Sequence, residues 1–259
     1  MWGVNISLDS LDATTYGRVT RGRLRDVLEG IEGALEAGFH GGVKLNVVLM
    51  KGVNEGELWK IVEYAAQKGI AAVRFIELMP VSDGDVTDSS RFLSISSAME
   101  ILRGHDELTP LPDTRLGAGP AKYWRLEMTG MRVGFIGAMT DEHFCEQCNK
   151  VRLTADGFIR PCLGQHGEHD LKPALRGLVP FVAKRPEREV WRLPNFTETV
   201  RSERSEASAQ RWQKEPVPLS HSCDAAVAQV LRRSLAEKPL EHLFRENYTP
   251  LRIMTAIGG

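Results

Sequence analysis

Residues 4–80 alternate short β-branched runs with longer stretches of helical periodicity, and this alternation restricts the fold more than any other feature of the sequence. Runs of strand length occur at residues 4–8, 43–50 and 72–79. Between them, apolar residues recur at three- and four-residue steps in residues 24–35 and 55–68. Parallel strands joined by right-handed helical crossovers explain this order, so we predict an α/β fold.

The strand predicted at residues 4–8 begins close to the start of the sequence. Three strands with both edges unpaired would expose rows of backbone hydrogen-bonding groups, so we expect further strands to precede Met1. A fragment, a misjudged gene start or one half of a split protein would each explain this. In barrel-type α/β sheets, ligands bind at the carboxyl ends of the strands. Those ends are residues 7–9, 50–51 and 77–79.

The periodicity changes after Pro80. Ser97 and Glu100 have the spacing of a capping box, which predicts a short helix that ends at Leu102. From about Lys122 onward, short strands are predicted at residues 123–126, 133–136, 151–154 and 158–160. We interpret these strands as a second, smaller module, in which Asp156-Gly157 forms a hairpin turn.

We divide the chain into an α/β part, residues 1–103, and a C-terminal α+β extension, residues 104–259. Within the extension, residues 180–220 are charged and weakly patterned, and we interpret them as a disordered insertion. A helix is predicted to resume near Ala225.

Composition narrows the range of partners. The net charge is −1, so no overall field attracts nucleic acid or an anionic membrane, and an anionic ligand needs local positive charge. Hydrophobic residues make up 42% of the chain, as in ordinary globular proteins. We see neither an apolar run that could span a bilayer nor a signal peptide, and expect a soluble, intracellular protein.

Three of the four cysteines form a cluster in the sequence. Cys145 and Cys148 make a CxxC pair, and Cys162 follows after thirteen residues, where the predicted hairpin returns it to the pair. Three thiolates suit a [4Fe–4S] cluster with one iron left open for substrate. With His166 they would instead make a closed Cys₃His zinc site, and the spacing alone does not choose between the two. Cys223 is interpreted as a plain thiol.

Several motifs together resemble one enzyme family. The segments that carry the resemblance are Val4–Asp12, Lys44–Asn46, Arg74–Pro80, Gly119–Ala121, Phe144–Gly157 and the terminal Gly258-Gly259. In this order they resemble the GTP 3′,8-cyclases of molybdenum cofactor biosynthesis, which are radical SAM enzymes. The resemblance covers nearly the whole chain except residues 180–220, and it favours iron–sulphur over zinc.

The resemblance implies that residues 1–103 form the back part of an incomplete radical-SAM-type (β/α) barrel, and that the C-terminal extension, residues 104–259, carries an iron–sulphur cluster. Family members hold two [4Fe–4S] clusters. The first, on a CxxxCxxC loop, cleaves S-adenosylmethionine to a radical that takes the C3′ hydrogen of GTP. C3′ then attacks C8, which gives (8S)-3′,8-cyclo-7,8-dihydroguanosine 5′-triphosphate. The second cluster binds guanine through its open iron.

Carried over residue by residue, the resemblance assigns the metal and cofactor contacts first. Cys145, Cys148 and Cys162 match the ligands of the second cluster. Ser7 and Met79 match positions that contact S-adenosylmethionine.

Lys44, Lys150 and Arg152 match contacts to GTP, and cations suit its triphosphate. Lys150 and Arg152 alternate along a predicted strand, so they can face the substrate together. Lys150 stands where the family usually has arginine, which keeps the charge but loses a bidentate phosphate contact.

Arg74, Gly258 and Gly259 match catalytic positions of the family. Arg74 lies in an apolar strand, where a guanidinium needs an anionic partner. The alternative to an active-site role is a salt bridge with Glu77 or Asp9. Gly258 and Gly259 match a tail that reaches into the active site, although as bare sequence they equally suit a frayed end.

The sequence has no CxxxCxxC motif, so we expect no radical generation by this chain alone. Two other hypotheses stay open: a non-catalytic GTP-binding accessory module that keeps only the auxiliary cluster or a zinc ion, and a different radical SAM maturase. The expected partners are GTP and S-adenosylmethionine, with a homodimer implied by the resemblance and neither membrane nor nucleic acid. We expect a cytoplasmic protein if the source is bacterial and a mitochondrial one if it is eukaryotic.

Overall fold

The computed structural model describes residues 2–81, 89–117, 119–146, 148–165, 167–176 and 223–244. The chain divides into two compact units. The first comprises Met1–Asn149 with Leu240–Ile253, and the second comprises Lys150–Pro239 with Met254–Gly259. Each unit is described by itself below.

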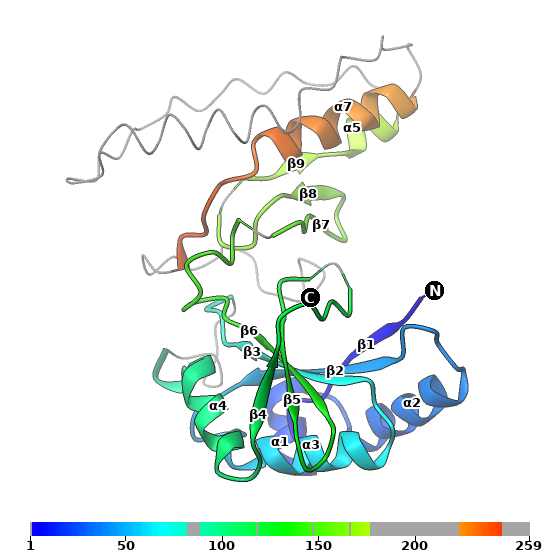
Figure 1. Cartoon of the computed structure of the whole chain (residues 1–259). Helices are drawn as coiled ribbons and strands as arrows, with labels where there is room; N and C mark the ends of the chain where they lie inside the picture. The colour runs from blue at the N-terminus through cyan, green and yellow to red at the C-terminus, as the bar shows by residue number, and fades with distance from the viewer. Residues whose placement is uncertain are drawn as a thin grey trace, which may run out of the picture. The chain divides into compact units, whose positions relative to one another are not determined.

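A mixed sheet forms the centre of the first unit (Figure 1). Within the described residues it has six strands in the order β1-β2-β3-β6-β5-β4. Their bounds are β1 Val4–Ser7, β2 Val43–Leu49, β3 Ala72–Glu77, β4 Leu108–Leu111, β5 Lys122–Leu126 and β6 Arg132–Ile136. β1, β2, β3 and β6 run parallel, while β4 and β5 pair antiparallel at the other edge. The predicted α/β fold with parallel strands is confirmed.

Among the described residues, four helices pack against one face of this sheet (Figure 1). They are α1 Ala13–Thr20, α2 Leu24–Glu36, α3 Leu58–Gln67 and α4 Ile95–Arg103, with short 3₁₀ turns at Glu55–Glu57 and Ser89–Arg91. α2 and α3 correspond to the helices predicted from periodicity, whereas α1 was not predicted. Asp12 caps α1, since its carboxylate accepts a hydrogen bond of 2.8 Å from the Thr15 amide.

Alternation along the strands decides which side chains enter the core. Odd-numbered residues of the central strands point to the helices, and they include Leu45, Val47, Val73, Phe75 and Phe135. Even-numbered residues of the same strands therefore point to the opposite face of the sheet. No helix among the described residues combines the length and apolar character needed to cross a membrane.

Two predictions about this unit need correction. Ser94, not Ser97, caps α4, because the Ser94 hydroxyl accepts the Ser97 amide at 3.2 Å. β5 and β6 do not begin a separate module, since β6 pairs with β3 in the large sheet. The expected boundary after residue 103 consequently lies inside the first compact unit. Local periodicity cannot reveal a pairing between strands so far apart in sequence.

The described residues of the second unit form a small antiparallel sheet and two helices. The order is β7-β8-β9, with β7 Arg152–Leu153, β8 Phe158–Arg160 and β9 His169–Asp170, and the helices are α5 Lys172–Leu175 and α7 Cys223–Ala236. The predicted hairpin turn is confirmed, because the Gly157 amide donates to the Thr154 carbonyl at 3.0 Å. The predicted insertion at residues 180–220 lies outside the described residues.

Candidate functional site

A row of polar side chains crosses the sheet on the face opposite the helices. Strand register aligns Ser7 with Asn46, Asn46 with Arg74, Arg74 with Gly134, and Gly134 with Tyr123. Directly paired residues of neighbouring strands point to the same side of a sheet. Two predicted site residues, Ser7 and Arg74, therefore lie in a single row. The sequence analysis named both residues but did not predict that they share a row.

Arg74 reaches across β6 toward Tyr123 because Gly134 has no side chain. A Cβ at Gly134 would lie 2.8 Å from Cε1 of Tyr123 and 3.1 Å from Cγ of Arg74. Burial raises the pKa of Tyr123, and the charge of Arg74 and a side-chain hydrogen bond with it act in the opposite direction. Arg74 and Tyr123 are thus neighbours that interact directly over a glycine.

Lys44 adds a second cation on the same face. It stands at the amino end of β2, is 5% exposed, and its Nζ donates to the Gly41 carbonyl at 3.0 Å. Burial lowers the pKa of Lys44, and the positive charge of Arg74 lowers it further. The two cations are therefore close enough to repel each other, and an anion bound beside them would relieve that repulsion.

Two polar atoms of the row are buried without a hydrogen-bond partner in the part of the chain that the structure describes. They are Oδ1 of Asn46 and Nε of Arg74, whose residues pair directly across β2 and β3. Buried polar atoms are nearly always paired in folded proteins, so each unpaired one requires an explanation. One acceptor and one donor side by side are what a polar ligand would satisfy.

The alternative partners expected for Arg74 serve other groups. Glu77 points to the helix side of the sheet, and Oδ1 of Asp9 accepts the Val48 amide at 2.7 Å. No ion pair of Arg74 with either carboxylate occurs among the described residues. The salt-bridge alternative for Arg74 finds no support in this geometry.

Buried side chains tie down the loops at the carboxyl ends of β1 and β2. Asn54 is fully buried, and its Nδ2 donates to the carbonyls of Asp9 and Val48, at 2.8 Å each. Its Oδ1 accepts the Met50 amide at 2.9 Å. Burial raises the pKa of Asp9 to about 6, although its hydrogen bond from Val48 opposes this rise. These contacts hold the loop that follows Ser7 in one conformation.

Glu77 performs the same task at the carboxyl end of β3. Its side chain is 1% exposed. Oε2 accepts the amides of Met139 and Thr140 at 2.8 and 2.9 Å, and Oε1 accepts the Thr140 hydroxyl at 2.6 Å and the Ile95 amide at 3.0 Å. The carboxylate thereby joins β3, α4 and the loop after β6. Met79, the predicted S-adenosylmethionine contact, follows two residues later and is half-buried.

The cysteines and their neighbours are divided between the two units. Cys145 and Cys148 belong to the first unit, where the Cys148 amide donates to the Cys145 carbonyl at 3.1 Å in a tight turn. Cys162 belongs to the second unit, and all three side chains are partly buried. Within single units, no group of three His, Cys, Asp or Glu gathers among the residues described.

Lys150 and Arg152 are both in the second unit. Arg152 opens β7 opposite Arg160, whereas Lys150 is exposed and precedes the strand, so the predicted strand is shorter than expected. Gly258, Gly259 and His166, the possible zinc ligand, lie outside the described residues.

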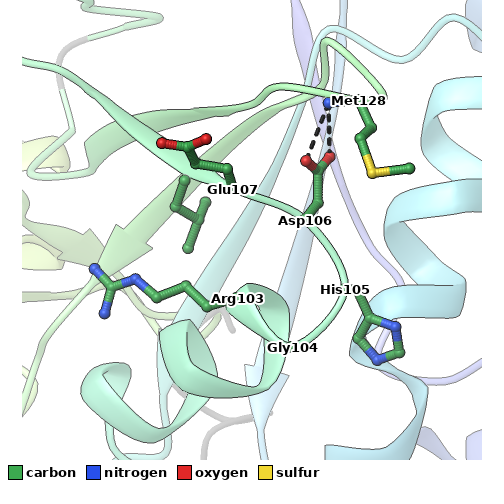
Figure 2. A pocket seen from close by; sticks show the side chains of 7 residues that line it. Arg103, Gly104, His105, Asp106, Glu107 and Met128 are labelled. Atoms are coloured by element: carbon green, nitrogen blue, oxygen red, sulfur yellow. Dashed lines mark hydrogen bonds between the residues drawn. The ribbon is translucent and has the colours of Figure 1, made fainter.

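A separate surface depression of about 580 Å³ lies on the first unit. Figure 2 shows the side chains that line it. It is lined by Arg103, Gly104, His105, Asp106, Glu107, Leu108 and Met128. The Asp106 carboxylate is engaged there with the Met128 amide, at 3.0 and 3.1 Å. None of the predicted site residues contributes to it, so it is not the candidate site.

Two protein-family models match consecutive parts of the chain. The Radical SAM superfamily model matches residues 2–65, and the Molybdenum Cofactor Synthesis C model matches residues 71–184. The GTP 3′,8-cyclase of Marinobacter nauticus is 43% identical over 178 residues, which are 67% of this chain and 52% of that protein. The GTP 3′,8-cyclase of Pelotomaculum thermopropionicum is 44% identical over 176 residues, with shares of 67% and 53%.

A third relative aligns along nearly the whole chain. The GTP 3′,8-cyclase of Desulforamulus reducens is 34% identical over 260 residues, which cover 99% of this chain and 65% of that protein. This chain is a homologue of the GTP 3′,8-cyclases. It spans about half the length of the first two relatives.

In this GTP 3′,8-cyclase homologue, the large mixed sheet is thus a partial radical SAM barrel. The polar row lies on the sheet face that its helices leave uncovered. Sequence reasoning had missed Asn46, Gly134 and Tyr123 as members of the row. Asn46 stands two residues after Lys44 in a run of strand length, and that spacing was the available signal. Gly134 and Tyr123 gave no such signal, because β6 joins β3, and β5 joins β6, only through tertiary structure.

Proposed function

We propose that this cyclase homologue binds GTP on the polar face of its partial barrel and supplies the GTP side of the 3′,8-cyclase reaction of molybdenum cofactor biosynthesis. The observation that carries the proposal is the row through Asn46, Arg74 and Tyr123 with Lys44 beside it. It combines two cations with a buried acceptor and a buried donor that have no partner among the described residues.

The charges on this face favour an anionic ligand. The chain as a whole carries a net charge of −1, so attraction for a triphosphate must be local. Lys44 and Arg74 supply that attraction, since a cation bound to phosphate oxygens makes stronger hydrogen bonds than a neutral donor. Arg74 is positioned by neighbouring strands, whereas Lys44 is anchored by its bond to the Gly41 carbonyl. In this proposal Arg74 contacts GTP close to the reacting atoms.

S-adenosylmethionine is proposed to bind at the carboxyl ends of β1 and β3. Ser7 ends β1 with an exposed side chain, and Met79 follows the end of β3. The buried contacts of Asn54 and Glu77 hold the two strand ends in fixed conformations. Gly258 and Gly259 are proposed to reach the same region as a C-terminal tail, on the strength of the family resemblance.

Cys145, Cys148 and Cys162 are proposed as the ligands of an auxiliary [4Fe–4S] cluster. The Cys145–Cys148 turn fits such a group, because a CxxC turn can present two thiolates to one centre. When bound, the cluster supplies an open iron to which guanine can attach. Lys150 and Arg152 are proposed to bind the phosphates of GTP.

The sequence contains no CxxxCxxC motif, so we propose that this chain binds substrate but does not turn it over alone. The accessory-module hypothesis makes the same prediction for activity. It differs in expecting that the addition of a chain with a radical SAM cluster gives no product.

Anaerobic reconstitution with iron and sulphide, followed by GTP titration calorimetry, tests the proposal. We expect about four irons per chain, a broad visible absorption that GTP perturbs, and measurable GTP binding. Lys44→Met should weaken GTP binding roughly tenfold or more, the range for a charge-assisted contact. Lys68→Met, which removes an equal charge from the surface just after α3, should leave GTP binding unchanged. A colourless protein with one zinc, or equal effects of the two substitutions, would reject the proposal.

A further inference from the structure

Tyr123 is a buried tyrosine on β5 that touches the key cation of the proposed GTP site. Its side chain is 5% exposed and aligned with Gly134, which is aligned with Arg74. Because the ring is enclosed, it has little freedom to move. A side chain that is itself held firmly can hold a flexible neighbour, and arginine is among the most flexible side chains.

Gly134 makes the contact between the two residues possible. A methyl group at this position would lie 2.8 Å from Cε1 of Tyr123 and 3.1 Å from Cγ of Arg74, so it would crowd both side chains. The glycine at this position has no unusual backbone conformation, since it is absent from the residues with positive φ. Its role is therefore to leave room between β3 and β5.

Arg74 also needs such a support. Its Nε is buried without a partner among the described residues, and Lys44 beside it repels its charge. The enclosed ring of Tyr123 lies beside the Arg74 side chain and limits its movement, and the interaction of the two groups lowers the pKa of Tyr123.

From this geometry we infer that Tyr123, seated against Arg74 through the gap at Gly134, is a positioning residue that fixes the Arg74 guanidinium for GTP. The inference rests on the proposed function, since it gives Arg74 a ligand to bind. Tyr123 acts through Arg74 and need not touch the substrate. The affinity for GTP then depends on the Tyr123 hydroxyl, which acts by holding Arg74 in position.

The test compares the full chain carrying Tyr123→Phe with a matched control, Tyr64→Phe. Both substitutions remove one hydroxyl and keep the ring, but the Tyr64 hydroxyl lies on α3 and has no hydrogen-bond partner among the described residues. Calorimetry with GTP should show a Kd raised roughly fivefold to tenfold in Tyr123→Phe. The Kd of Tyr64→Phe should equal that of the wild type.

A second measurement reports the contact itself without GTP. The chain is labelled with 3-fluorotyrosine and titrated by ¹⁹F NMR, with the Tyr123 signal assigned by its loss in Tyr123→Phe. Because the charge and hydrogen bond of Arg74 lower the pKa of Tyr123, Arg74→Met should raise that pKa, while the charge of Arg132 remains in place.

The outcomes separate the two claims. An unchanged titration in Arg74→Met, or equal GTP affinities of Tyr123→Phe and the wild type, would overturn the inference alone. If the wild-type chain binds no GTP while the titration shifts as expected, the proposed function fails and the contact stands without a role in GTP binding.

Discussion

Replacement of Glu77 by glutamine tests how firmly the carboxyl end of β3 is tied to the elements around it. The two carboxylate oxygens accept four hydrogen bonds, from the Ile95, Met139 and Thr140 amides and the Thr140 hydroxyl. Glutamine has one acceptor oxygen, and its amide group faces backbone donors at the other position. Whichever way the amide turns, at least one buried N–H group loses its acceptor.

The expected cost follows from this geometry. Hydrogen bonds to charged groups contribute about 1.5–3 kcal/mol, and a buried donor left unpaired costs a similar amount. We therefore expect Glu77→Gln to lower the free energy of unfolding by about 2–4 kcal/mol, and Glu77→Ala by roughly 3–5 kcal/mol, because all three amides then lose their acceptor. Glu29→Gln is the control, since Glu29 is exposed on α2 and should change stability by less than about 0.5 kcal/mol.

Urea unfolding followed by tryptophan fluorescence measures these differences, because Trp124 packs on Phe135 with ring centroids 5.2 Å apart. A double-mutant cycle with Thr140→Val should give a coupling energy of at least about 1 kcal/mol between the two side chains. A loss below about 1 kcal/mol for Glu77→Gln, or additive effects in the cycle, would refute the view of Glu77 as the link between β3, α4 and the loop after β6.

Three further predictions follow from other buried groups. Burial raises the pKa of Asp9 from 3.8 to about 6, so the folded state binds more protons than the unfolded state and loses stability as the pH rises from about 4 to 7. Asp9→Asn should remove this pH dependence and raise the free energy of unfolding at pH 7 by up to about 3 kcal/mol, as measured by urea unfolding. Gly134→Ala should lower stability by roughly 1–3 kcal/mol because the added methyl group crowds Tyr123. Gly33→Ala, at an exposed position of α2, should raise stability by about 0.5–1 kcal/mol. Thermal unfolding that shows both substitutions changing stability in the same direction would contradict this prediction. Arg160→Met should speed hydrogen exchange in β8, since the buried guanidinium bonds the Gln165 carbonyl at 2.7 Å, and unchanged protection would show that this contact is dispensable.

Much of the first unit was accessible from the sequence because its signals are local. The runs around Leu45 and Phe75 have strand length and β-branched composition, and the helices between them have clear apolar faces. The same alternation that buries Leu45 places Lys44 on the other face, so the side of the sheet could have been deduced as well. Two members of the candidate site, Ser7 and Arg74, were named from the sequence and lie in one row.

The other members of the candidate site depend on strand pairing, which no local sequence pattern reveals. Tyr123 enters the row only because β5 pairs with β6, and β6 with β3, across a long stretch of chain. The capping box predicted at Ser97 rested on Glu100 three residues later, yet in the structure Ser94 caps the helix and its hydroxyl accepts a backbone amide. The metal and substrate roles of Cys145, Cys148 and Cys162 stay predictions.

The contacts of Asn54 and Glu57 have a consequence for the order of folding. Asn54 donates to the carbonyl of Asp9, and Glu57 accepts the Ser10 hydroxyl at 2.8 Å together with the Leu11 amide at 2.8 Å. These partners are 45 to 47 residues apart, so the loops cannot close until β1 and β2 have already met in register. We expect the loops at the proposed ligand end of the barrel to be among the last parts of this unit to form and the first to open.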